Sequence, residues 1–379
     1  MDKAPLFGPF RRDQRAQFDE IKWLFEAVND ESNPQTLIDV GAHLGNVFKS
    51  FAEADWEVHA IEPYPPHFEA LSLRCDNQVN VHLHKVAIGD SNGTTLPFYA
   101  SYESSGINSL SPFRSSHRKV AEVAVTTLAH LVESQSINRV DFLKIDTEGY
   151  DLMALKGFPW RKFLPRIVVC EFEDAKTMPV GYKMEEMAML LETHGYRVLV
   201  SEWHPIIRYG IPHDWHALRK FPATLETEKT WGNLIAIRDS SDLSLLIETA
   251  ASHCSFYDDV LVAKSIHGAN PELDGKVLGA LLEGMQIVIF GAGGSGQIAL
   301  HSIRNIECEV LCFADNDPNK HGSKLHGLPV VSAQELSTMP LDLILIASDF
   351  AQDIYRDLIS IGLPDEKIRI FHVCIGFEP

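Results

Sequence analysis

The chain has 379 residues and is acidic, with 33 Lys and Arg against 52 Asp and Glu and a formal net charge of −19. This charge repels phosphate backbones, so nucleic-acid binding is not expected, and no apolar run is long enough to span a membrane. Residues 1–12 lack the apolar stretch of a signal peptide and no CxxC pair is present, which together favour a reduced, cytoplasmic protein.

The first two thirds of the chain alternate between helical and strand-like segments. Residues 11–29 predict an amphipathic helix, because apolar residues recur there at spacings of three and four. Further helices are predicted at 47–54, 68–74 and 183–193. Strands are predicted at 36–40, 57–62, 79–88, 140–146, 166–172, 196–202 and 233–239. This order is typical of an α/β fold with a doubly wound, mostly parallel sheet.

A second α/β unit is predicted in the last third of the chain. A polar seam at 239–242 ends the first domain, which we expect to span residues 1–240. Residues 241–284 are predicted to form a helical connector. A strand, a glycine-rich turn and a helix then begin a smaller Rossmann-like domain over residues 285–379.

A candidate cofactor turn, DVGAHLGN, follows the strand at 36–40 and begins a helix. Its glycines allow a tight turn and the helix start offers free N–H groups, while Glu62 at the end of the next strand is placed to accept bonds from ribose hydroxyls. The turn is not GxGxxG, so an adenosine ligand without phosphate, S-adenosylmethionine, fits better than a dinucleotide. The alternative is a plain strand–turn–helix corner. The predicted contacts are Asp39, which would face the ammonium group, Gly41, His43, Gly45, Asn46 and Glu62.

The end of the strand predicted at 79–88 supplies two further candidate contacts. Ligands of doubly wound sheets lie across the carboxyl ends of the strands. Ala87 is therefore expected beside the adenine ring and Asp90 near its amino group. Ordinary turn chemistry explains the run GDSNG equally well.

The densest group of chemical side chains follows the strand at 140–146. Lys144 and Asp146 lie on one face of this strand, Glu148 is in the following turn, and Glu171 ends the next strand. Crowded carboxylates raise one another's pKa, which makes a general base, or hold a divalent cation. Helix capping and solvated acids are the alternative, which applies most to Asp151.

Residues 140–157, VDFLKIDTEGYDLMALKG, resemble the signature of the FkbM-type S-adenosylmethionine-dependent methyltransferases. The segments TLIDVGAHLG and AIEPYP are similar to the cofactor segment of that family, and IVVCEF and WGNLIAI fit its later strands. The resemblance implies a class I methyltransferase fold and O-methylation of a small hydroxylated molecule such as a sugar or polyketide. It also implies cofactor contacts at Asp39, Gly41 and Glu62, and an acidic motif at Asp146 and Glu148.

Methyl transfer to a hydroxyl needs in-line alignment and removal of the hydroxyl proton. Asp146 or Glu148 is the predicted base, Glu171 would assist or share a metal, and Lys144 would hold a carboxylate or the acceptor. The polar segment 101–113 is either a lid or a surface loop. His82 and His84 are expected to be structural, because metal ligation needs a third ligand, and His204 is a candidate for the acceptor site.

A second glycine-rich turn, GAGGSG, follows the strand near residue 290, and Asp315 ends the next strand. This arrangement matches the dinucleotide fingerprint, with Gly291, Gly293, Gly296 and Asp315 as candidate contacts. The region resembles the nucleotide-binding N-terminal domain of sugar acyltransferases. The sequence leaves open whether it binds a nucleotide, a nucleotide-sugar or NAD(P), or serves as an interface.

The leading hypothesis is an S-adenosylmethionine-dependent O-methyltransferase that acts on a sugar or glycoconjugate in polysaccharide biosynthesis. The alternatives are an NAD(P)-linked or nucleotide-sugar-binding oxidoreductase or epimerase, and a non-enzymatic nucleotide-sugar-binding scaffold. A hydroxylated small molecule is the expected partner. Divalent-metal dependence and homo-oligomer formation are left open by the sequence.

Overall fold

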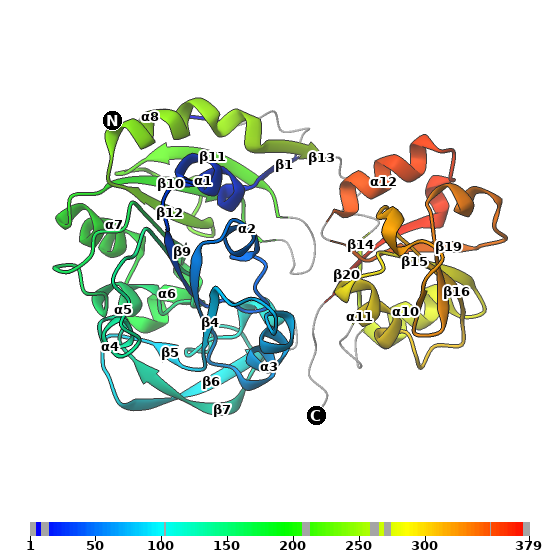
Figure 1. The fold of residues 1–379 in the computed structure, drawn as a ribbon, viewed down its shortest axis with the longest axis horizontal. Helices are drawn as coiled ribbons and strands as arrows, with labels where there is room; N and C mark the ends of the chain where they lie inside the picture. Colours follow the sequence, from blue (N-terminus) through cyan, green and yellow to red (C-terminus); the bar gives the residue numbers. More distant parts are fainter. Residues whose placement is uncertain are drawn as a thin grey trace. The chain divides into compact units, whose positions relative to one another are not determined.

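The computed structural model describes residues 5–8, 15–101, 104–206, 213–257, 265–268, 274–348 and 350–373. These residues form two compact units, and the first unit ends at Phe256 (Figure 1). Helix α8, Ser240–Thr249, therefore lies in the first unit, although the sequence places it in the connector. Residues 258–264 and 269–273 of the predicted connector lie outside the described residues.

The first unit is built on an eight-stranded sheet with the order β11-β10-β12-β9-β8-β2-β3-β4. Its strands are β2 Thr36–Val40, β3 Glu57–Ile61, β4 Val81–His84, β8 Phe142–Ile145, β9 Ile167–Glu173, β10 Arg197–Trp203, β11 Trp215–Lys220 and β12 Trp231–Ile237. The strands from β4 to β9 are parallel, whereas β12 pairs antiparallel with both β9 and β10. The carboxyl ends of β2, β3, β8 and β9 therefore meet at one edge. The predicted doubly wound fold is confirmed.

Helices cover both faces of this sheet because its buried strands point apolar side chains alternately to either side. Leu37 packs with α1, α2 and α3 on one face, and Ile38 packs with α4, α5 and α7 on the other. The helices are α1 Glu20–Val28, α2 Lys49–Glu53, α3 Pro65–Arg74, α4 Leu128–Ser134, α5 Asp151–Lys156, α6 Asp174–Thr177 and α7 Met184–Thr193.

Two sequence predictions at the start of the chain and after β4 are wrong in their bounds. The helix predicted from residue 11 begins at Glu20, because Arg15–Phe18 form β1, which pairs with β13, Cys254–Tyr257. Residues 11–14 of that prediction lie outside the described part. The strand predicted over 79–88 ends at His84, and Ala87–Ile88 form β5 in a different sheet.

That different sheet has three strands in the order β5-β7-β6, with β6 at Thr94–Ser101 and β7 at His117–Thr126. It lies at the bottom of the first unit in Figure 1. Strand β6 carries Pro97, which a sequence pattern takes as a break, but β6 is an edge strand and an edge tolerates proline. The sequence analysis predicts neither β6 nor β7.

The second unit has a seven-stranded sheet with the order β14-β20-β19-β15-β16-β18-β17. Strand β15 lies between β16 and β19, so the strand order reverses there, as it does in doubly wound folds. Its strands are β14 Ser265–Gly268, β15 Gln286–Phe290, β16 Glu309–Ala314, β17 Lys324–Leu325, β18 Leu328–Val331, β19 Leu343–Ile346 and β20 Ile368–Val373. Its helices are α10 Asp274–Leu282, α11 Gly294–Ser302 and α12 Ala351–Ser360.

Short 3-10 helices connect several of these elements. They span Ser105–Ile107, Met178–Val180, Ala250–His253, Pro318–Lys320, Gln334–Thr338 and Asp365–Lys367. Across the described ranges, no helix is both long and apolar enough to cross a membrane.

Candidate active site

The predicted cofactor turn is held tightly at the edge of the first sheet. The backbone φ angles of Gly41, His43 and Gly45 are 81°, 49° and 83°, in the left-handed region. A Cβ on Gly41 would lie 1.8 Å from the carbonyl oxygen of Asp146, so only glycine fits there. Asn46 is exposed at the end of the turn. The turn is therefore in direct contact with the acidic motif that follows β8.

Glu62 is oriented by hydrogen bonds from the main chain around it. Its two carboxylate oxygens accept hydrogen bonds from the backbone N–H of His43, at 3.0 Å, and of Tyr64, at 2.9 Å. The side chain of His67 packs edge-on against His43 beside it. Glu62 is only 4% exposed, and burial raises its pKa to about 7. Each carboxylate oxygen keeps one lone pair that could accept a further hydrogen bond. Ribose binding by Glu62 stays a prediction.

Lys144 connects the cofactor turn to the acidic motif. Its Nζ lies 3.3 Å from Asp39 Oδ1, 3.4 Å from Asp146 Oδ2 and 3.3 Å from the carbonyl oxygen of Gly41. Burial lowers the pKa of Lys144, but Asp146 and Asp39 outweigh burial and hold that pKa above its ordinary value. Asp39 is fully buried behind this lysine, and burial raises its pKa. A contact of Asp39 with a ligand ammonium group stays a prediction.

The adenine contacts predicted at the end of the third strand lose their structural basis. Ala87 and Ile88 are buried, and they pair with Val125 and Thr126 of β7 instead of continuing β4. Asp90 is exposed in the turn that follows. The strand-end argument for Ala87 is therefore wrong, because the chain leaves the large sheet after His84.

Three predicted carboxylates come together beyond β8 and β9. Asp146, Glu148 and Glu171 each present an oxygen, and these oxygens lie within 4.8 Å of one another. The side chain of Asp146 is 38% exposed, whereas Glu148 and Glu171 are buried. The backbones of Glu148 and Gly149 are left-handed, with φ of 57° and 107°, which turns Glu148 back toward β9. Asp146 is thus the accessible carboxylate of the group.

Lys176 is the main site residue that sequence reasoning missed. Its side chain is 2% exposed, and Nζ lies 2.6 Å from Glu148 Oε2, 2.8 Å and 2.9 Å from the two Glu171 oxygens, and 3.2 Å from Glu173 Oε2. Burial raises the pKa of Glu148 and of Glu171, although the ammonium of Lys176 opposes the rise. The available signal was the local pattern EFEDAK, in which a lysine follows three acids.

Asp151 is the first residue of α5 and is fully buried, but its carboxylate bonds to groups outside that helix, so the capping alternative is not borne out. Its carboxylate accepts a hydrogen bond from the Thr147 hydroxyl, at 2.8 Å, and from the backbone N–H of Glu171, at 3.2 Å. These contacts fix the turn between β8 and α5 against the end of β9.

The described part of the segment 101–113 packs against the acidic motif. The hydroxyl of Ser109 donates to the carbonyl oxygen of Glu148 at 2.7 Å, and Lys176 Nζ lies 5.8 Å from the centre of the Phe113 ring. Residues 102 and 103 lie outside the described residues. The segment therefore covers the carboxylates, and its function as a lid stays a prediction.

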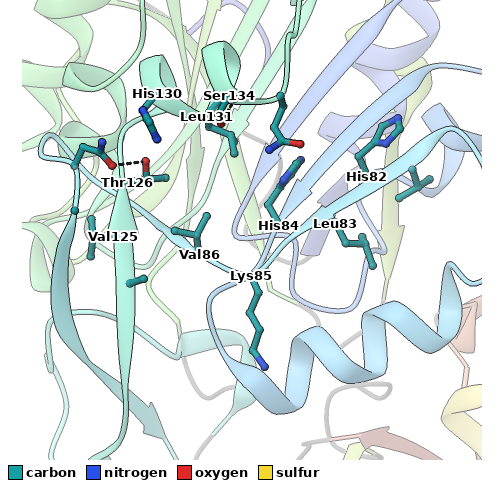
Figure 2. Close-up of a pocket in the computed structure, with 15 residues that line it drawn as sticks. His82, Leu83, His84, Lys85, Val86, Val125, Thr126, His130, Leu131 and Ser134 are labelled. Carbon is teal, nitrogen blue, oxygen red and sulfur yellow. Dashed lines mark hydrogen bonds between the residues drawn. The ribbon is translucent and has the colours of Figure 1, made fainter.

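His82 and His84 lie away from the acidic motif, on the edge strand β4. Both stack against His59, and His82 Nε2 is 3.1 Å from Glu57. They line an open cavity of about 830 Å³ together with Lys85, Val86 and Thr126 (Figure 2).

The side chain of His204, which follows β10, contacts the side chains of Glu226 and His216. His204 Nδ1 is 2.9 Å from Glu226, and its ring lies 4.5 Å from that of His216. The Arg219 guanidinium is 3.4 Å from His216 Nε2, so a cation already faces this histidine pair.

In the second unit, the glycine turn and Asp315 meet as predicted. A Cβ on Gly296 would lie 1.8 Å from the carbonyl oxygen of Gly291, whose φ is 117°, whereas a Cβ on Gly293 would meet open space. Asp315 Oδ2 accepts from the backbone N–H of Ala292 and from Lys320 Nζ, both at 2.8 Å. Burial by itself would raise the pKa of Asp315, but these donors outweigh burial and lower that pKa below its ordinary value.

Residues 39–198 match the family model of the methyltransferase FkbM domain. The matched FkbM segment contains the cofactor turn, Glu62, the acidic motif and Lys176. The chain is also 29% identical over 155 residues to the hexuronic acid methyltransferase AglP of Haloferax volcanii, over 38% of this chain and 58% of that protein. The chain thus matches a methyltransferase domain over part of its length and spans less than two thirds of this curated relative.

Among solved structures, the chain is similar to the methyltransferase FkbM of Methylobacillus flagellatus. The identity is 17% and the TM-score 0.32, over 49% of this chain and 42% of that one. Residues 283–369 match a second family model, C2185-like, N-terminal. UDP-D-quinovosamine 4-dehydrogenase of Vibrio fischeri is also similar, with 18% identity and a TM-score of 0.19 over 23% of this chain and 75% of that one.

Proposed function

We propose that the first unit transfers a methyl group from S-adenosylmethionine to a hydroxyl of a sugar or glycoconjugate. The observation that carries the proposal is the bridge made by Lys144, which joins Asp39 of the cofactor turn to Asp146 of the acidic motif. In this proposal, Asp39 belongs to the side that binds the methyl donor and Asp146 to the side that binds the acceptor, and Lys144 pairs with both. The methyltransferase FkbM match and the similarity to a hexuronic acid methyltransferase support a sugar acceptor.

In this proposal, one group of residues binds the methyl donor and another removes the proton of the acceptor. S-adenosylmethionine supplies an electrophilic methyl group on a positively charged sulfur. Glu62 would accept hydrogen bonds from the ribose, and the left-handed turn at Gly41 lets the backbone approach the ligand. Asp146, the accessible carboxylate, would take the proton of the attacking hydroxyl as the new carbon–oxygen bond forms and the carbon–sulfur bond breaks. The segment around Ser109 would exclude water from these carboxylates.

For the second unit, we propose binding of a nucleotide or nucleotide-sugar at the turn formed by residues 291–296. The N–H of Ala292 already points to a carboxylate, Asp315, at the carboxyl edge of the sheet. The helix start at Gly294 is placed to receive a phosphate group. A nucleotide-sugar held there would be related in chemistry to the sugar acceptor of the first unit.

Calorimetric titration tests the function of the first unit without knowledge of the acceptor. We expect the protein to bind S-adenosylhomocysteine, and Glu62→Gln to weaken this binding about 10- to 100-fold, because hydrogen bonds to a charged group are lost. Glu226→Gln, at a half-exposed carboxylate near His204, is the matched control and should bind as the wild type does. Absence of binding to the folded wild-type protein would refute the proposal. Titrations with uridine diphosphate and NAD test the second unit in the same way.

A further inference from the structure

An ammonium lies against two of the three carboxylates of the acidic group. Asp146, Glu148 and Glu171 have the composition and spacing of a site for a divalent cation. Lys176 Nζ, however, lies within 2.9 Å of both oxygens of Glu171 and of one oxygen of Glu148. Both Glu171 oxygens face this ammonium, so a divalent cation bound to Glu171 would lie close to the positive charge of Lys176 and be repelled by it.

The backbone is built to keep Lys176 in this place. A Cβ on Gly149 would lie 2.6 Å from the carbonyl oxygen of Lys176, so the turn after β8 is in direct contact with the first turn of α6. The hydroxyl of Tyr182 donates to the carbonyl oxygen of Gly149 at 2.9 Å and holds that turn from the other side. The lysine is thus fixed by main-chain contacts and is not a surface side chain that has folded inward.

Among the residues that the structure describes, the other groups around the cluster do not supply a competing cation. The acids that face it are Asp146, Glu148, Asp151, Glu171 and Glu173. His213 also lies near, but burial, and to a smaller degree Lys176 itself, lowers the pKa of His213 to about 4, so its ring is neutral. Lys144 binds the far side of Asp146 and Asp39. Lys176 therefore carries the positive charge for Glu148 and Glu171.

We propose that Lys176 is the fixed cation of the acceptor site and takes the place that a divalent metal would have among these carboxylates. It is a positioning residue: it binds Glu148 and Glu171 and leaves Asp146 as the open carboxylate that receives the hydroxyl proton. This inference rests on the proposed function, because it assigns the cluster to the acceptor end of the transfer site. It predicts methyl transfer that does not depend on an added metal.

Manganese binding tests the inference independently of any acceptor. Wild-type protein should show no Mn²⁺ uptake that is sensitive to Glu171→Gln, measured by calorimetry and water-proton relaxation. Lys176→Ala should gain one Mn²⁺ per chain, and the double variant Lys176→Ala/Glu171→Gln should lose it. Lys183→Ala removes an exposed lysine that pairs with Asp174 in the same segment, and it should gain none.

The outcomes separate this inference from the proposed function. Uptake of Mn²⁺ by the wild type that Glu171→Gln abolishes would overturn it, as would failure of folded Lys176→Ala to bind the ion. If Lys176→Ala folds only when Mn²⁺ is present, the inference is supported; if it does not fold at all, the wild-type titration decides. S-adenosylhomocysteine binding should be unchanged in Lys176→Ala, whereas loss of that binding in the wild type would refute the methyltransferase proposal instead.

Discussion

Two buried lysines organise the carboxylates at the edge of the first sheet. Lys144 pairs with Asp39 and Asp146, and Lys176 pairs with Glu148, Glu171 and Glu173. Buried charges are stable only when they are paired, and removal of one partner of such a pair typically costs about 3–5 kcal/mol. Each lysine therefore fixes a set of acids whose mutual repulsion would otherwise open the site.

At the same scale, Asp146→Asn should reduce methyl transfer while it preserves the fold. The amide keeps the shape of the side chain but cannot accept the hydroxyl proton, and general-base catalysis is typically worth about 10²- to 10⁴-fold in rate. We expect kcat to fall within this range and S-adenosylhomocysteine binding to persist. Transfer of labelled methyl groups to a panel of uronic acids and pyranosides measures the effect. Asp174→Asn is the control, and full activity of Asp146→Asn would exclude it as the base.

At the scale of elements, the site exists because parallel strands end at a common edge. Strand β2 leads into the cofactor turn, β3 into Glu62, β8 into Asp146, and β9 carries Glu171 near its end. The close contact between Gly41 and Asp146 and between Gly149 and Lys176 joins these strand ends through the main chain. Glu171 is therefore positioned by a strand, and Asp146 and Glu148 by a turn that these main-chain contacts fix.

Helix α1 is attached to the same sheet through a buried acid, which gives the protein a pH dependence. Glu20 accepts hydrogen bonds from Trp203, at 2.9 Å, and from Asn233, and burial raises its pKa to about 7. The folded state thus holds a proton that the unfolded chain releases above about pH 4.5. Stability contributed by this proton is lost as the pH rises from about 4.5 to 7, by at most about 1.4 kcal/mol per pH unit for one group.

Replacement of this acid by its neutral isostere should remove that part of the pH dependence. Glu20→Gln keeps the side-chain volume and one of the two acceptor oxygens but removes the titrating group, so we expect a flatter dependence of melting temperature on pH between 5 and 7.5 than in the wild type. Glu31→Gln, at an exposed carboxylate just after α1, should leave the wild-type dependence unchanged. Thermal unfolding followed by circular dichroism measures both, and parallel curves for Glu20→Gln and wild type would contradict the assignment.

At the scale of the whole molecule, each unit has the two apolar layers of a doubly wound domain. In the second unit, Ile289 packs on one face of the sheet and Phe290 on the other, as Leu37 and Ile38 do in the first unit. Among the described residues, each apolar cluster consists of side chains from one unit. This construction favours two unfolding transitions instead of one.

Ligands should act on these transitions separately. Saturation with S-adenosylhomocysteine at about 100 times its Kd stabilises the unit that binds it by about 2.7 kcal/mol, and should raise one melting transition only. Leu345→Ala, in the centre of β19, should lower the other transition. Differential scanning calorimetry distinguishes the two. A single transition that responds to both changes would show that the units unfold together.

The sequence alone determined the α/β class, the positions of most strands in the large sheet, and the cofactor turn with Glu62. These features depend on local patterns: alternation of apolar residues, glycines that a left-handed turn requires, and an acid at a strand end. The acidic motif was predicted for the same reason, since Lys144, Asp146 and Glu148 follow one another along the chain.

Tertiary structure alone decided the rest. The pairing of β5 and β6 with β7 depends on contacts between residues far apart in the sequence, which no local pattern records, so Ala87 was assigned to the wrong sheet. Lys176 has the sequence context of a surface lysine, and only the packing of α6 against the turn at Gly149 buries it among three acids. The ion pairs of Lys176 are strong because the fold excludes water from them, and this burial depends on contacts that only the folded chain makes.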